Sequence, residues 1–284
     1  MKFVITAAFV TALGFILACV LNAQTARAEF RKVVEKRLGE KKLKLADVCP
    51  VDTNVVARRV FKDYGAMFIA DKSVKFPSKC VFESDEDVLV FQNTVKSTTK
   101  TINGTSVTLQ DAAMKAFEAA RDEGAKVGVN ITARGASASK RSYADTARSW
   151  KSRFDPALKY WIGKGRIKAA DAEKARNMAA IDQVARVMEW EQDKIWFSTR
   201  FNYSIFSSVA APGTSQHLSM IALDVAQFAN KDAKAILNSN GWFQTIIDDL
   251  PHFTYIGRDE EDLPKYGLRP ETRDGVKFWI PNFD

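Results

Sequence analysis

The chain has 284 residues, of which 46% are hydrophobic, enough to bury one sizeable core and a smaller accessory lobe. Lysine and arginine exceed aspartate and glutamate by eight, but both signs are scattered along the sequence, so the excess indicates a general surface property. The basic residues form no long run and accompany no zinc-finger or RNA-binding signature, so no nucleic-acid partner is predicted.

The N-terminus has the pattern of an export signal. Lys2 precedes an apolar stretch over residues 3–21, and residues 26–28 form an A-x-A cleavage site. We therefore predict a signal peptide over residues 1–28, an exported protein of the cell envelope, periplasmic or extracellular, and no stable membrane span after cleavage. Two alternatives stay open: a retained membrane anchor, because the apolar run approaches the ~20 residues that span a bilayer, and a lipid attached to Cys19.

Removal of this signal would leave two cysteines, Cys49 and Cys80, in an exported setting that permits disulfides. We predict a bridge between them, which would stabilise the fold by roughly 3–4 kcal/mol in the chain-entropy model. Two free buried thiols are the alternative. Both cysteines belong to an N-terminal region over residues 29–107, in which apolar pieces at residues 64–69 and 88–91 predict strands.

Beyond residue 107, helical and strand patterns alternate. A segment similar to a capping box at Thr108 opens a predicted helix that ends near Gly124. The elements predicted next are a strand over residues 127–133, helices over 143–162 (interrupted at Pro156) and 169–195, a strand over 220–225, a helix over 231–240, and strands over 242–247 and 252–257. Residues 258–284, rich in charge and proline, form a predicted surface tail. The pattern predicts an α+β fold.

The chain has only two histidines, His217 and His252, and each lies among turn residues, acids and short strands. A catalytic zinc ion takes about three protein ligands, typically histidines with one carboxylate, and keeps one position open for water. Asp224 is the candidate carboxylate, because it lies between apolar residues of a predicted strand and a buried acid needs a partner such as a cation. Alternatively, Asp224 caps a backbone amide and the histidines are ordinary surface or core residues.

The flanking sequences resemble a known family. Residues 211–224, APGTSQHLSMIALD, resemble the A-P-G-x-S-x-H-x-x-G-x-A-x-D segment of the D-alanyl-D-alanine carboxypeptidases of the vancomycin-resistance family. Residues 249–257, DLPHFTYIG, are similar to that family's second block, E-P-W-H-F-R-Y-V-G, and residues 140–146, KRSYADT, resemble its upstream Y-R-S-Y-x-x-Q stretch. The resemblance covers roughly residues 127–257, with the blocks in the same order.

The resemblance implies a zinc-dependent peptidase that acts on peptidoglycan stem peptides, namely a D-Ala-D-Ala carboxypeptidase. Its peptidase domain would span residues 108–257, with a small antiparallel sheet that carries the zinc ligands, helices around it, and an N-terminal extension. The implied roles are Zn²⁺ binding by His217, Asp224 and His252, general base catalysis by Asp249, and substrate binding by Arg141 and Ser215.

The sequence also departs from the family pattern. Asp249 replaces a glutamate, and a misplacement of ~1 Å can cost on the order of 10²-fold in rate. Met220 replaces a glycine, Pro251 a tryptophan and Thr254 an arginine. Asp248 is an alternative base, and Arg134, which follows a predicted strand, is a rival of Arg141.

These departures leave two competing hypotheses open. One is a catalytically weakened or inactive cell-wall-binding homologue that keeps the zinc scaffold, and the other is a metal-free structural or adhesion module of an exported protein. The sequence does not distinguish a carboxypeptidase from an endopeptidase, and it does not set the oligomeric state.

Overall fold

The structure is a computed structural model that describes residues 29–283. The predicted signal peptide over residues 1–28, including Cys19, lies outside the described residues. Between residues 29 and 283, no helix combines the length and apolar character needed to cross a membrane. Helices and small antiparallel sheets make up this part of the chain, which confirms the predicted α+β fold class.

The N-terminal region up to residue 93 is helical. It contains α2 (Phe30–Gly39), α3 (Leu45–Val48), α4 (Val55–Tyr64), the 3-10 helix η1 (Gly65–Ile69) and α5 (Asp85–Asn93). The strands predicted at residues 64–69 and 88–91 are therefore wrong, because a short apolar run has no periodicity that separates a buried strand from a buried helical turn. The predicted disulfide is present: Cys49 and Cys80 are bonded, with their Cα atoms 5.2 Å apart.

A hairpin follows, formed by β1 (Ser97–Ile102) and β2 (Thr105–Gln110), and leads into α6 (Asp111–Lys126). Asn103 and Gly104 occupy its turn with positive φ angles, 48° and 78°, as a two-residue hairpin connection requires. Thr108 pairs with Thr99 inside this hairpin, so the predicted capping box is wrong although the helix after it is present. The predicted strand over residues 127–133 is reduced to one bridge between Ala133 and Val225.

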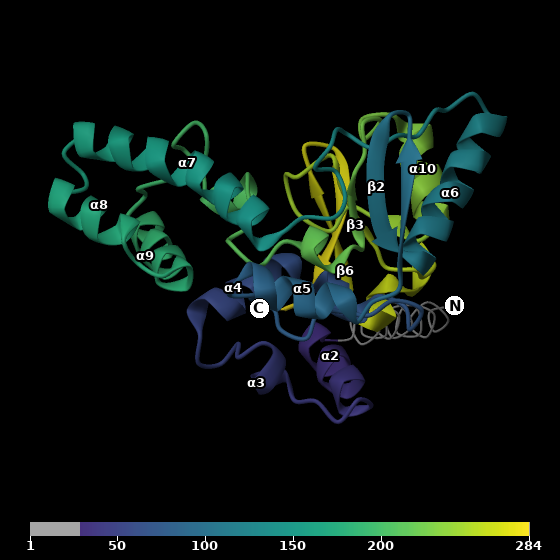
Figure 1. Cartoon of the computed structure of the whole chain (residues 1–284), viewed down its shortest axis with the longest axis horizontal. Helices are drawn as coiled ribbons and strands as arrows, with labels where there is room; N and C mark the ends of the chain where they lie inside the picture. Colours follow the sequence, from purple (N-terminus) through teal and green to yellow (C-terminus); the bar gives the residue numbers. More distant parts are fainter. Residues whose placement is uncertain (1–28, 284) are drawn as a thin grey trace, which may run out of the picture.

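Three helices form a group to one side of the sheets (Figure 1). They are α7 (Tyr143–Gly163), α8 (Ala169–Arg176) and α9 (Ala180–Gln192). Helix α7 continues through Pro156, contrary to the predicted interruption. The long helix predicted over residues 169–195 is divided in two, because the Asn177 side chain donates a hydrogen bond to the carbonyl oxygen of Glu173 (3.0 Å) and ends α8.

A three-stranded antiparallel sheet in the order β3-β5-β4 lies at the centre of the C-terminal half. Its strands are β3 (Ala222–Asp224), β4 (Trp242–Phe243) and β5 (His252–Tyr255), all shorter than predicted; the predicted helix α10 (Lys231–Ser239) is present beside them (Figure 1). The short 3-10 helices η2 (Ile205–Ser207) and η3 (Gln216–Ser219) precede the sheet. The sheet strands are buried, so their positions are fixed by the core.

The C-terminal residues form ordered structure in place of a surface tail. The 3-10 helix η4 (Glu260–Tyr266) leads into a hairpin of β6 (Leu268–Arg273) and β7 (Val276–Pro281). Phe278 of this hairpin is fully buried, and the backbone of Trp279 donates to the carbonyl oxygen of Gln244 (2.8 Å). Burial of Phe278, Trp279 and Pro281 on β7 therefore attaches this segment to the core.

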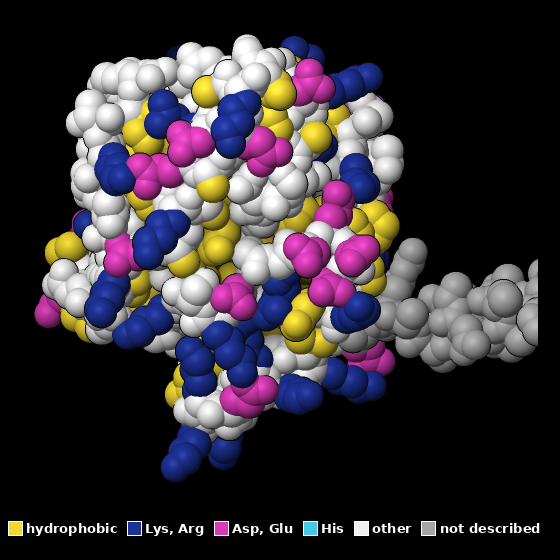
Figure 2. All heavy atoms as spheres, turned by 90° about the vertical axis from the view of Figure 1, so that its right-hand side faces the viewer, with side chains coloured by type: hydrophobic (Ala, Val, Ile, Leu, Met, Phe, Trp, Pro, Cys, Tyr) yellow, Lys and Arg dark blue, Asp and Glu magenta, His cyan; other side chains and the backbone are white. Residues whose placement is uncertain are grey.

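Charges of both signs are interspersed on the face that Figure 2 shows, in agreement with the predicted general surface property. No histidine is visible on that face. Both histidines are in fact buried, with exposed fractions of 1% for His217 and 2% for His252. A buried imidazole needs polar partners, and the site around the two rings supplies them.

Candidate metal centre

The register of the central sheet brings two of the predicted ligands together. Asp224 of β3 is the direct cross-strand partner of His252 of β5. Directly opposed residues of an antiparallel pair point to the same face, with Cβ atoms about 4.5–5.5 Å apart. The Asp224 carboxylate and the His252 imidazole therefore meet because of strand pairing, although 28 positions separate them in the sequence (252 − 224).

The third predicted ligand comes from the turn that feeds β3. His217 lies in η3, whose first turn is capped by the Ser215 hydroxyl, the acceptor for the His217 backbone amide (3.4 Å). The turn ends at Met220, which adopts a left-handed conformation with φ of 55°. A left-handed residue with a side chain costs about 1 kcal/mol or more, which explains physically why a glycine would suit this position.

The three ligand atoms have the spacing of a metal site. Nε2 of His217 lies 3.1 Å from Nδ1 of His252, and Oδ1 of Asp224 lies 3.2 Å and 3.4 Å from these two nitrogens. A tetrahedral zinc ion with bonds of about 2.0–2.1 Å requires ligand atoms about 3.3 Å apart. Among residues 29–283, these three side chains are the group of histidine, cysteine and acidic residues close enough to share an ion.

The hydrogen bonds on the far sides of both rings fix where their protons are. Nδ1 of His217 lies 2.8 Å from the carbonyl oxygen of Ser139, and Nε2 of His252 lies 2.8 Å from Oε1 of Gln216. Both of these oxygens accept, so each of these nitrogens carries its ring's proton. The facing nitrogens therefore present lone pairs to one another and to a carboxylate, with no proton left to form a hydrogen bond between them. A bound cation would stabilise this arrangement.

Burial and charge support this assignment of protons. Burial lowers the pKa of His217 to about 4, despite the opposing effect of the Asp224 carboxylate, so the ring is neutral near pH 7. Asp224 accepts a hydrogen bond from the Arg141 guanidinium (2.6 Å), which stabilises its ionised form. Two neutral imidazoles and one carboxylate are a donor set that suits Zn²⁺.

Arg141 contacts the candidate centre through a ligand. Its guanidinium donates to Oδ2 of Asp224 (2.6 Å) and to the carbonyl oxygen of Ser137 (2.9 Å). This ion pair leaves Oδ1 of Asp224 directed at the two histidines, so Arg141 orients the carboxylate. Its rival Arg134 lies over the ring of Phe228, 5.3 Å from the ring centroid.

A cavity of about 410 Å³ opens on the three ligand side chains. Asp249, Arg141 and Ser215 line it together with the ligands, so the structure brings all six predicted site residues to one place. Burial raises the pKa of Asp249, which makes its carboxylate a better proton acceptor than an ordinary aspartate. Asp248, the alternative base, lines a neighbouring pocket instead.

Gln216 is a residue of the site that the sequence analysis did not single out. It is fully buried, its amide nitrogen donates to the carbonyl oxygen of Tyr64 (2.8 Å), and its Oε1 accepts from His252 and Thr254. The hydrogen bond that the Gln216 amide nitrogen donates to Tyr64 fixes the orientation of the amide. Its oxygen therefore faces His252 and keeps the proton of that ring on Nε2. A glutamine next to a histidine has no pattern in a single sequence that marks this role.

If the candidate centre binds zinc, we expect Gln216→Ala to weaken that binding by about 10- to 100-fold, the usual cost of losing a hydrogen bond to a metal-bound histidine. Competition with a fluorescent chelator measures the affinity. Gln227→Ala is the matched control, because Gln227 bonds Thr132 and contacts no ligand. Equal zinc affinities of the two variants would contradict the role given to Gln216.

Gly213 of the first motif is required by close packing. Its φ is +76°, and a Cβ built there would lie 1.9 Å from the carbonyl oxygen of Phe82. We expect Gly213→Ala to lower the free energy of unfolding by roughly 3 kcal/mol, the upper part of the usual range for one substitution. Gly275 has the same φ with nothing within 4 Å, so Gly275→Ala should cost only about 1 kcal/mol. Urea titrations of both variants test this difference, and equal losses would show that packing against Phe82 is unimportant.

Fold and site together define an α+β protein with a candidate metal centre of two histidines and one aspartate. No family model matches the chain, and no curated protein matches it. Among solved structures, the LdcB LD-carboxypeptidase, described as revealing the molecular basis of peptidoglycan recognition, matches with a TM-score of 0.30 and 17% sequence identity. The match covers 53% of this chain and 60% of that one, so this chain spans less than two thirds of the protein it matches.

Proposed function

We propose that this protein is an exported zinc-dependent peptidase that hydrolyses peptidoglycan stem peptides, with His217, Asp224 and His252 as the metal ligands. The observation that carries the proposal is the convergence of three lone-pair donors at 3.1–3.4 Å, with both ring protons held on the far sides. The motifs around these residues, which resemble D-Ala-D-Ala carboxypeptidases, support the choice of substrate class and of the terminal D-alanine as leaving group.

When bound, zinc would polarise a peptide carbonyl and lower the pKa of a coordinated water towards ~7. Asp249 lines the cavity together with the ligands, and we assign its carboxylate the role of taking a proton from the attacking water. The same group then returns the proton to the leaving amine, a role worth about 10²–10⁴-fold in rate. Its raised pKa suits both halves of this exchange.

Arg141 and Ser215 have positioning roles in this mechanism. Arg141 pairs with Oδ2 of Asp224, and because its guanidinium lines the cavity it can also donate to a substrate carbonyl or carboxylate. Ser215 caps the turn that carries His217 and lines the cavity. Each of these residues therefore lines the cavity and also contacts one of the ligand residues.

A second candidate function is favoured by one observation, the aspartate at the base position. A shorter side chain than the glutamate of the family pattern places the carboxylate differently, and ~1 Å can cost on the order of 10²-fold. The alternative is a cell-wall-binding homologue that binds zinc and has weak or no activity. It differs from the proposed enzyme in turnover alone.

The decisive experiment incubates the purified mature chain with a synthetic stem pentapeptide and measures released D-alanine. The proposal expects release that a chelator abolishes and added zinc restores. Stoichiometric zinc without release would favour the binding homologue. Well under one zinc per chain after purification without chelator, and no rescue by added zinc, would leave the metal-free module as the remaining hypothesis.

A further inference from the structure

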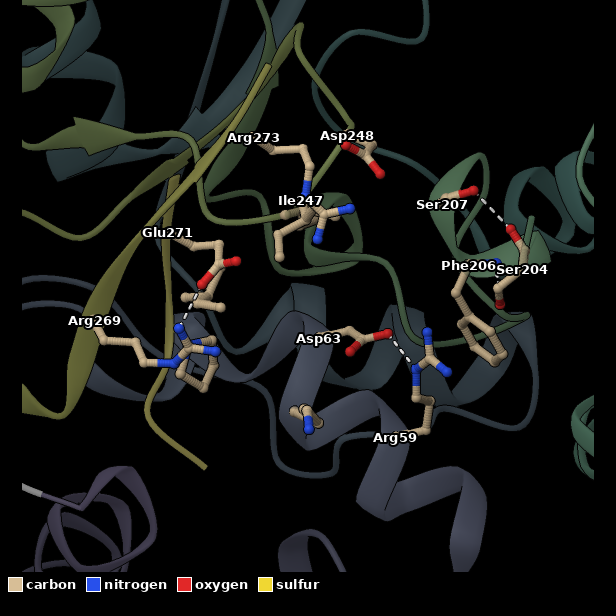
Figure 3. Close-up of a pocket in the computed structure, with 14 residues that line it drawn as sticks. Arg59, Asp63, Ser204, Phe206, Ser207, Ile247, Asp248, Arg269, Glu271 and Arg273 are labelled. Carbon is tan, nitrogen blue, oxygen red and sulfur yellow. Dashed lines mark hydrogen bonds and ion pairs between the residues drawn. The ribbon is translucent and has the colours of Figure 1, made fainter. Parts of the chain in front are cut away.

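A second pocket, of about 310 Å³, adjoins the cavity of the candidate metal centre. It lies between α4, the loop before β5 and the hairpin of β6 and β7 (Figure 3). Phe206, Ser207 and Ile246 line both this pocket and the metal-centre cavity. A peptide seated at the metal centre can therefore place a neighbouring residue in the second pocket.

Most charged side chains of this pocket are already engaged. Arg59 pairs with Asp63 on α4, and Arg269 pairs with Glu271 on β6 (2.6 Å). Lys62 also has a partner. In these ion pairs the opposite charges offset each other, so a charged ligand would be recognised by the charged side chains of the pocket that are not paired.

Two charges remain, Arg273 and Asp248, which form no ion pair or side-chain hydrogen bond with any residue between 29 and 283. Arg273 is the last residue of β6, held next to the hairpin turn, and Figure 3 shows it reaching toward the loop of Ile247 and Asp248. Asp248 has a left-handed backbone with φ of 68°. Aspartate is among the residues that adopt this conformation most readily, so the loop can hold Asp248 in this position.

We propose that this pocket binds a substrate residue that carries both a free carboxylate and a free ammonium group, with Arg273 receiving the carboxylate and Asp248 the ammonium. Arg273 and Asp248 line the same small pocket, so a guanidinium and a carboxylate are both available to bind such a zwitterion. A phosphate or a second carboxylate would be repelled by Asp248, and a simple amine by Arg273. The inference rests on the proposed function, and it deepens that function by naming a feature of the substrate away from the cleaved bond.

The test compares three stem pentapeptides that differ only in the third side chain. One carries diaminopimelate, whose side chain ends in both groups; the second carries lysine, which has the ammonium alone; the third carries acetyl-lysine, which has neither charge. We expect KM to rise from the first to the third by about 3- to 10-fold per lost charge, with kcat little changed. Arg273→Gln should remove the difference between diaminopimelate and lysine, and Asp248→Asn the difference between lysine and acetyl-lysine.

Asparagine tolerates the left-handed backbone of residue 248, so Asp248→Asn changes the charge and keeps the conformation. Arg200→Gln, at an exposed arginine outside this pocket, is the control for lost positive charge and should leave all three KM values unchanged. Equal KM values of the wild-type chain for the three peptides would overturn the proposed pocket and leave the peptidase intact. If no peptide is hydrolysed, calorimetry with the same peptides decides: ordered affinities support the pocket, and equal affinities or no binding overturn it.

Discussion

His217→Ala is expected to lose zinc and, with it, all hydrolytic activity. A four-ligand zinc site gains roughly 10–16 kcal/mol in total, so one ligand contributes about 3–4 kcal/mol, which corresponds to roughly 10²–10³-fold in affinity. His252→Ala should behave in the same way, because the two nitrogens stand in equivalent positions 3.1 Å apart. Elemental analysis after purification without chelator measures the loss directly.

Thermal unfolding gives a second readout that does not depend on activity. Zinc at about 100 times its dissociation constant should stabilise the wild-type chain by about 2.7 kcal/mol, whereas neither histidine variant should respond. Asp249→Asn, a change in the same cavity at a residue that is not a ligand, should respond as the wild type does. A wild-type melting temperature that does not respond to zinc would contradict the proposed metal centre and the proposed zinc peptidase.

Asp249→Asn is expected to keep zinc and to lower kcat by about 10²–10⁴-fold, because the amide cannot accept the proton of the attacking water. Asp249→Glu should remain active, since it keeps the carboxylate and restores the residue of the family pattern. Asp122→Asn, at an exposed aspartate on α6, is the matched control and should keep the wild-type rate. Equal rates for the wild type and Asp249→Asn would show that Asp249 is not the general base.

The pH profile follows from the same residue. Burial raises the pKa of Asp249, and a base acts only when it is deprotonated. Activity should therefore fall as the pH drops through a value above the ~3.9 of an ordinary aspartate. In the Asp249→Asn variant, the residual rate should lack this step.

The fold was predicted unevenly, and the reason is the range over which each signal acts. Helices α6 and α10 have apolar residues at helical spacing, a local pattern, and both are present. The apolar runs at residues 64–69 and 88–91 are too short to show a period. The first is buried and helical, whereas Leu89 and Val90 of the second are exposed on α5. Residues 127–133 alternate as a strand does, yet only Ala133 finds a partner strand.

The sequence by itself determined the chemical inventory of the site: two histidines, the acid between apolar neighbours, and the flanking motifs that suggested their use. Only the tertiary structure decided that Asp224 faces His252, that Ser139 and Gln216 hold the ring protons, that Arg141 pairs with a ligand, and that a second pocket shares a wall with the first. Residue types and local periodicity can be read directly from the sequence. These contacts depend on strand register and on packing between distant segments, and no local sequence pattern specifies them.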